Sequence, residues 1–140
     1  MKIFLDVNVI VAVLNREYPL FTPAARILSL SDNKRFQIYT SPLCLAIAYY
    51  FAEKKSSSKH ARSGIEILAG KLIITTVNQE TVRLSVKNPA ITDFEDGLEY
   101  YSAVQSGCQA IITEDVSDFF FSKIPVMNCE TFILSLISQK

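Results

Sequence analysis

Short apolar runs alternate with longer amphipathic segments along the whole chain. The runs predict five β-strands, over residues 3–5, 36–40, 72–75, 110–113 and 124–127. Apolar residues with helical spacing predict helices between and after them, over residues 9–14, 23–30, 43–53, 59–69, 80–86, 93–106 and 128–138. Strands that alternate with helices are typical of a parallel sheet covered on both faces. The sequence therefore predicts an α/β fold of three layers, α/β/α, with a mainly parallel sheet of four to five strands.

Polar residues and glycines mark where the helices are expected to begin and end. The predicted N-caps are Asn8, Thr22, Ser41, Thr76 or Asn78, and Thr92. Glu95 lies three residues after Thr92 and completes a capping-box pattern. Gly70 and Gly107 are expected to terminate their helices, because glycine favours the position after a helix C-terminus.

The composition indicates one globular domain over residues 1–140. The chain is 49% hydrophobic, and its 14 Lys and Arg residues balance 14 Asp and Glu residues. A balanced charge does not indicate nucleic-acid binding by the whole surface, so any contact with nucleic acid would be a local patch. No apolar run has the length of a membrane-spanning helix, and no signal-peptide pattern precedes the first strand. Cys44, Cys108 and Cys129 lack CxxC spacing and are expected to be reduced core thiols, which indicates a cytoplasmic protein.

Acidic residues gather where the predicted strands end and the helices begin. Asp6 directly follows the first strand, and Asp96 lies in the first turn of its predicted helix. Asp118 follows the fourth strand by a few residues, with Asp115 between them. Strand C-termini and helix N-termini share one edge of a parallel sheet, so we expect these carboxylates to meet there. An acid in a first helical turn is also explained by the helix dipole, but we expect no such local duty for Asp6.

Carboxylates that meet at one edge repel one another, and a divalent cation relieves that repulsion. Mg²⁺ prefers oxygen ligands and keeps positions open for water and phosphate oxygens. Such an ion stabilises developing charge and lowers the pKa of a bound water, as phosphodiester hydrolysis requires. The acids therefore predict a metal site with hydrolytic chemistry.

Three segments resemble the motifs of the PIN-domain family, metal-dependent ribonucleases that include the toxins of VapBC toxin–antitoxin systems. MKIFLDVNVIVAVL resembles the opening strand with its D-x-N signature. DFEDGLEYYSAVQSG resembles the third motif, and IITEDVSDF resembles the fourth. The resemblance implies that Asp6, Asp96 and Asp118 are catalytic ligands of Mg²⁺ or Mn²⁺. It further implies that Asp115 is an auxiliary ligand, while Asn8 and Thr113 orient carboxylates by hydrogen bonds.

The chain departs from the family pattern at its second motif. SPLCLAIAYY places Ile47 where the family has a glutamate, and isoleucine cannot bind a metal. The loss is expected to weaken the site or to change its metal preference. Glu95 and Asp93 are candidates for the missing ligand. Gly97 replaces the family's usual alanine, at a cost to helix stability on the order of 1 kcal/mol.

These features lead to a main hypothesis and two rivals. The main one is a metal-dependent endoribonuclease of the PIN/VapC type that hydrolyses RNA, forms a homodimer and pairs with an antitoxin protein. The first rival is a PIN fold without catalysis that acts as a binding or scaffold module, which Ile47 motivates. The second is a phosphatase with Asp6 as nucleophile; Asn8 and Ile10 do not match the D-x-D-x-T/V motif of such enzymes.

Two further clusters are expected to be structural. Basic residues gather at residues 54–62, where a solvated helix start is preferred over a phosphate-steering patch. Tyr49, Tyr50 and Phe51 are expected to pack in the core.

Overall fold

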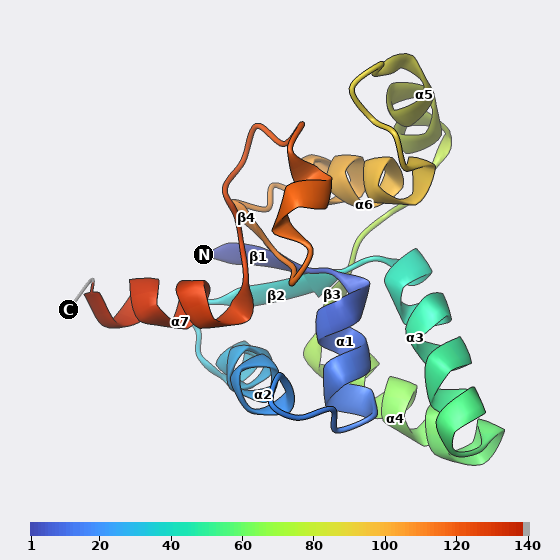
Figure 1. Ribbon diagram of the computed structural model, residues 1–140, viewed down its shortest axis with the longest axis vertical. Coiled ribbons are helices and arrows are strands. Elements are labelled where there is room, and N and C mark those ends of the chain that lie inside the picture. Colours follow the sequence, from blue (N-terminus) through green and yellow to red (C-terminus); the bar gives the residue numbers. More distant parts are fainter. Residues whose placement is uncertain (139–140) are drawn as a thin grey trace.

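The computed structural model describes residues 1–138 (Figure 1). Its centre is a five-stranded sheet in the order β3-β2-β1-β4-β5, and every neighbouring pair of strands is parallel. The strands are β1 (Lys2–Leu5), β2 (Gln37–Thr40), β3 (Ile73–Ile74), β4 (Ala110–Ile112) and β5 (Val126–Met127). The predicted α/β/α architecture and parallel sheet are confirmed.

The first strand is the central one, and both of its edges are paired. Leu5 at its carboxyl end lies opposite Ile112 of β4, and Phe4 lies opposite Tyr39 of β2. The strand is buried from Ile3 to Leu5. Because β1 ends at Asp6, that acid emerges at the middle of the sheet's carboxyl edge.

Helices cover both faces of the sheet. In Figure 1, α5 and α6 lie above the sheet, while α1, α2, α4 and α7 lie below it. The helices are α1 (Val7–Leu14), α2 (Phe21–Ser29), α3 (Pro42–Lys55), α4 (Ser58–Lys71), α5 (Gln79–Lys87), α6 (Phe94–Gln105) and α7 (Cys129–Ser138). Two short 3-10 helices complete the fold, η1 (Leu30–Asp32) and η2 (Val116–Phe119).

Two apolar cores fill the spaces between the layers. The larger core joins Ile3 and Leu5 of β1 to buried residues of α1, α2 and α7. The smaller core joins Phe4 of β1 to Tyr100 and Ala103 of α6. Successive residues of β1 thus face opposite layers, as the two-residue period of a strand requires.

Several predicted helix ends are wrong, and each has a local reason. The first helix begins at Val7 because Asp6, rather than Asn8, is its N-cap and accepts a hydrogen bond from the Val7 amide. The second begins at Phe21, ahead of the expected Thr22 cap. Gly70 lies inside α4, which continues to Lys71. The caps at Ser41 and Asn78 and the positive φ of Gly107 are as predicted.

Helix α3 is not buried all round, contrary to the prediction for its aromatic residues. Its buried residues are the small ones, Cys44, Ala48 and Ala52, which allow close packing against the neighbouring helices. Tyr50 and Phe51 are about half exposed, at 50% and 48%. None of the helices described in residues 1–138 has the length and hydropathy that crossing a membrane requires.

Candidate metal centre

Asp6 is held rigidly at the junction of β1 and α1. Its side chain is buried, with 4% of the residue exposed. Oδ1 accepts a hydrogen bond from the Val7 amide at 2.7 Å, and Oδ2 accepts one from the Thr113 hydroxyl at 2.7 Å. Burial raises the pKa of Asp6, and interactions with Glu99, Thr113 and the Val7 amide act against that rise. Asp6 therefore has a local duty as a helix cap, which the sequence analysis did not expect.

Thr113 links Asp6 to the loop after β4. Its hydroxyl accepts hydrogen bonds from Nδ2 of Asn8 and from the Asp115 amide, both at 3.1 Å. Nδ2 of Asn8 also lies 3.1 Å from Oδ2 of Asp115. Oδ1 of Asn8 accepts from the Glu114 amide at 3.2 Å. This network fixes the orientation of Asp6 and Asp115.

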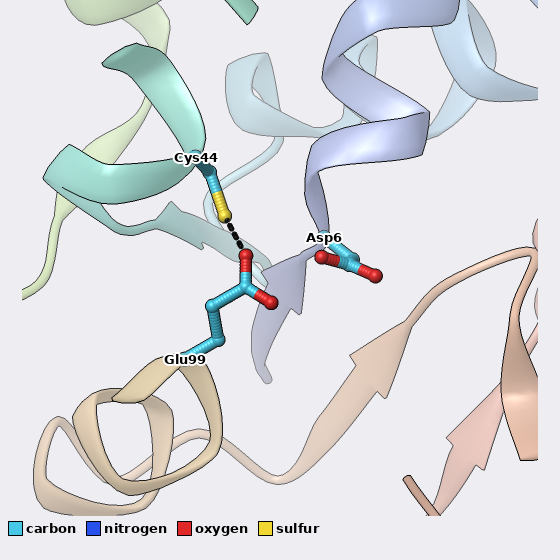
Figure 2. A group of neighbouring side chains, drawn as sticks. All are labelled: Asp6, Cys44 and Glu99. Carbon is cyan, nitrogen blue, oxygen red and sulfur yellow. Dashed lines mark hydrogen bonds between the residues drawn. The ribbon is translucent and has the colours of Figure 1, made fainter. Parts of the chain in front are cut away.

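A buried acid outside the predicted set lies beside Asp6. Glu99 of α6 is fully buried, and its Oε1 accepts a hydrogen bond from the Cys44 thiol at 2.6 Å. Its Oε2 is buried and has no hydrogen-bonding partner. Figure 2 shows the Glu99 carboxyl group between the Cys44 thiol and the Asp6 carboxylate. Burial, and then the charge of Asp6, raises the pKa of Glu99 to about 10.

The acids at the start of α6 belong to the same electrostatic environment. Asp96 is half-buried, and its pKa is raised to about 7, first by burial and then by the charges of Asp93, Asp6 and Asp118. Burial and the charges of Asp93 and Asp6 raise the pKa of Glu95. The structure thus brings Asp96 close enough to Asp6 and to Asp118 for their charges to act on it.

Asp93 is engaged as the N-cap of α6. Its Oδ1 accepts a hydrogen bond from the Glu95 amide at 2.9 Å. The predicted cap at Thr92, with Glu95 as its box partner, is therefore wrong, because the helix starts one residue later. Neither Asp93 nor Glu95 joins the close group around Asp6, which instead contains Glu99 and Cys44.

The remaining predicted ligands lie on the exposed loop after β4. Asp115 and Asp118 are exposed, and Asp118 is part of η2. The two salt bridges among residues 1–138 are Lys71–Asp32 and Arg83–Glu80, so none neutralises this group of acids. The acidic edge carries uncompensated negative charge and can attract a cation.

The ligand atoms closest together come from Asp6, Cys44 and Glu99. One atom from each lies within 4.8 Å of the others, and all three residues are buried. A divalent ion fits this group chemically, because it would satisfy the unpartnered Oε2 of Glu99 and offset the negative charge. Sequence reasoning missed Glu99, although its position three residues after Asp96 places both on one face of α6.

The basic cluster and the main groove lie away from these acids. Lys55 and His60 belong to the cluster and line a groove of about 710 Å³ between α1, α2, α3 and α4. Cys44 is in the first turn of α3 and Lys55 is its last residue. A helix of this length separates its ends by about 20 Å, so the cluster does not border the acids.

Comparison with known proteins agrees with this architecture. The family model described as "PIN domain" matches residues 2–117. The chain is 30% identical over 135 residues to Ribonuclease VapC1 of Aquifex aeolicus (strain VF5), covering 94% of this chain and 92% of that protein.

Solved structures share the fold at low sequence identity. VapBC2 from Rickettsia felis, bound to a DNA fragment from its promoter, matches with a TM-score of 0.69 and 17% identity, covering 91% of this chain and 98% of that chain. Mycobacterium tuberculosis VapC20, described as a sarcin-ricin loop cleaving toxin, matches with a TM-score of 0.66 and 18% identity over 88% and 98% of the two chains. VapBC-1 from nontypeable Haemophilus influenzae matches with a TM-score of 0.68 and 18% identity, covering 93% of this chain and 99% of that chain. The chain therefore belongs to the PIN domain family and is a relative of the ribonuclease VapC1.

Proposed function

We propose that this protein is a metal-dependent endoribonuclease that hydrolyses RNA phosphodiester bonds. The observation that carries the proposal is the acidic surroundings of half-buried Asp96, whose pKa is raised to about 7, first by burial and then by the charges of Asp93, Asp6 and Asp118. No salt bridge among residues 1–138 offsets them. The likeness to Ribonuclease VapC1 supports the same chemistry for this chain.

In this proposal each side chain has a defined task. Asp6, Asp96 and Asp118 hold Mg²⁺ or Mn²⁺, with Asp115 as an auxiliary ligand. Thr113 and Asn8 keep Asp6 and Asp115 oriented through the hydrogen bonds described above. When bound, the divalent ion stabilises charge on the phosphate oxygens and lowers the pKa of the attacking water. Asp6 is buried, whereas Asp115 and Asp118 lie on an exposed loop. A substrate would therefore approach the acids from the side of this loop.

RNA cleavage by purified variants tests the proposal. Wild-type protein is expected to cleave RNA in the presence of Mn²⁺, and Asp96→Asn is expected to reduce cleavage to background because a ligand is lost. Asp32→Asn is the matched control, since Asp32 pairs with Lys71 on a different part of the surface. An Asp96→Asn protein that cleaves RNA as well as wild type would refute the proposal.

The competing function is a PIN fold without catalysis that acts as a binding or scaffold module. Ile47 motivates it, because this position lacks the family's second acid. Calorimetry with Mn²⁺ on wild type and Asp6→Asn separates the two. Binding that Asp6→Asn abolishes favours the nuclease, and absence of binding at millimolar Mn²⁺ favours the scaffold.

We also propose an antitoxin protein as a partner, which the VapBC neighbours support by analogy of fold. The groove between α1, α2, α3 and α4 is lined by apolar side chains that include Phe21 and Ile67. Its basic rim includes Arg16, Lys55 and Lys71. An amphipathic partner segment with acidic flanks would complement both features.

A homodimer is the remaining part of the proposal. The neighbouring aromatic residues Tyr50 and Phe51 are half exposed on α3, and aromatic side chains are enriched at interfaces. Light scattering of wild type and Phe51→Glu tests this surface. A dimer that Phe51→Glu converts to a monomer supports it, and a wild-type monomer excludes it.

A further inference from the structure

The Cys44 thiol and the Glu99 carboxyl group form a buried pair directed at Asp6. Cys44 lies in the first turn of α3, where its amide donates to the Ser41 hydroxyl at 3.0 Å. The thiol in turn donates to Oε1 of Glu99 at 2.6 Å. Three elements that are distant in sequence, β1, α3 and α6, therefore converge on one point (Figure 2).

The hydrogen bonds of this group leave one buried oxygen atom of Glu99 without a partner. Oε2 of Glu99 is buried and has no hydrogen-bonding partner. A buried polar atom without a partner costs free energy comparable to a lost hydrogen bond. In the metal-free protein a proton on Glu99, shared with Asp6, offsets that cost. Because the neighbours are a thiol and a carboxylate rather than a basic side chain, an occupant that replaces this proton is a cation.

We propose that Asp6, Cys44 and Glu99 bind one thiophilic divalent ion, of the zinc and cobalt class, in preference to Mg²⁺. The inference rests on the proposed function, since Asp6 is shared with the catalytic centre. Glu99 then takes the place of the acid that Ile47 removes, but from α6 instead of α3. Cys44 adds a ligand type that the carboxylate site alone does not have.

The chemistry of the three ligands selects this class of metal. Zn²⁺ and Co²⁺ accept thiolate, carboxylate and imidazole ligands, whereas Mg²⁺ requires oxygen and near-octahedral geometry. In a tetrahedral site with bonds of about 2.0–2.3 Å, neighbouring donor atoms lie about 3.3–3.8 Å apart. The ligand atoms lie within 4.8 Å of one another, and Cys44 Sγ lies 2.6 Å from Glu99 Oε1. This short distance must lengthen and the widest must contract, each by roughly 1 Å, to reach that geometry.

The position of Cys44 in the first turn of α3 also favours a thiolate there once a metal is bound. The positive end of the α3 dipole lies at its N-terminus and stabilises negative charge there. Burial, and then the charges of Glu99 and Asp6, raises the pKa of Cys44 well above its usual range, so the thiol keeps its proton without a metal. On binding, the metal replaces the proton of the Cys44 thiol and that of the Glu99 carboxyl group, and both protons leave to water.

Cobalt absorption spectroscopy on the metal-free full chain tests the proposal. Cobalt is the probe because a thiolate bound to Co²⁺ gives a charge-transfer band in the near ultraviolet. We expect this band in wild type, its loss in Cys44→Ser, and at least a tenfold weaker Co²⁺ affinity in Glu99→Gln. Cys129→Ser is the matched control, since Cys129 is also buried but lies outside the group, and it should retain the band.

A second variant covers the case in which Cys44→Ser does not fold. The double variant Cys108→Ser/Cys129→Ser leaves Cys44 as the single thiol of the chain. The charge-transfer band is expected to persist in it. A band that disappears here, or that survives in folded Cys44→Ser, overturns the assignment of Cys44.

Failure of this metal site can be distinguished from failure of the proposed nuclease function. RNA cleavage with Mn²⁺ that depends on Asp96, together with no thiolate–cobalt band, would overturn this inference and leave the nuclease intact. A band that depends on Cys44, together with no RNA cleavage under any divalent ion, would support the metal site and reject the nuclease.

Discussion

The hydroxyl of Thr113 donates a hydrogen bond of 2.7 Å to Oδ2 of Asp6 and so joins the ends of strands β4 and β1. The same hydroxyl accepts from Asn8 and from the Asp115 amide, both at 3.1 Å. All of its hydrogen-bonding capacity is therefore in use. A single side chain holds the central carboxylate and the loop of exposed acids in one arrangement.

We expect Thr113→Val to weaken both the fold and the metal site. Valine keeps the shape but removes the donor to buried Asp6, so the free energy of unfolding should fall by roughly 1–3 kcal/mol. Mn²⁺ affinity should fall by about 10–100-fold, because the carboxylate loses its orientation. Urea denaturation and calorimetry measure these effects. Thr113→Ser keeps the hydroxyl and should retain most of the free energy of unfolding and most of the Mn²⁺ affinity. Equal losses in Thr113→Val and Thr113→Ser would contradict this role of the hydroxyl.

Stability of the metal-free protein should fall as the pH rises through the neutral range. The pKa of Asp96 is raised from 3.8 to about 7 and that of Glu99 from 4.5 to about 10, so the folded state binds these protons more tightly than the unfolded state. This contribution is complete below pH 4 and is lost toward pH 7 for Asp96 and pH 10 for Glu99. Chemical denaturation with a chelator present measures it.

Two variants assign that pH dependence to its groups. Glu99→Gln mimics the protonated acid and should remove the decline above pH 7 and part of it below, while Asp96→Asn should reduce the slope only between about pH 4 and 7. Unchanged slopes in both variants would show that neither carboxyl group has a raised pKa.

Gly97 should resist replacement by alanine, although alanine is the better helix former. A Cβ atom there would lie 3.0 Å from Ile91 Cγ2, from Ser85 Cβ and from Ser85 Oγ. Overpacking against the α5 side should outweigh the gain in helix propensity, giving a net destabilisation of roughly 0.5–2 kcal/mol. Thermal and urea denaturation measure the change.

Gly70→Ala is the control for that substitution. Gly70 also lies in a helix, but a Cβ there meets nothing within 4 Å. It should raise the free energy of unfolding by roughly 0.5–1 kcal/mol. A stabilising effect of Gly97→Ala would mean that α5 moves aside freely.

Restoring the family acid should shift the site toward oxygen-loving ions. Ile47 lies three residues after Cys44, close to one turn further along α3, and is only partly buried, so Ile47→Glu should be tolerated. Mg²⁺ should bind at least about tenfold more tightly, equal to about 1.4 kcal/mol. Calorimetry measures this, with Ile47→Gln as the control that changes polarity without adding charge. Equal affinities in both variants would show that position 47 does not face the metal.

The sequence was sufficient for the fold. Strand positions followed from apolar runs, and Asp6, Asp96 and Asp118 were predicted as site residues because strand and helix ends share an edge in parallel sheets. Glu99 was missed because it lies in the middle of a helix, where a glutamate is ordinarily exposed. Its burial depends on the way α6 packs over β1 and α3, which no local pattern reports. The prediction that Cys44 is a reduced core thiol is confirmed, but its contact with Glu99 depends on the same packing of α6.

The position of β1 at the middle of the sheet has a consequence for local opening of the molecule. Amides of residues 3–6 are enclosed on both sides by β2 and β4, so their hydrogen exchange should require nearly global unfolding. Amides of residues 114–118 lie in an exposed loop and a single 3-10 turn, and should exchange through small fluctuations. A ligand bound between the end of β1 and the loop would slow hydrogen exchange mainly in residues 114–118. Protection of these amides would therefore report that the site is occupied, while exchange in residues 3–6 would remain unchanged.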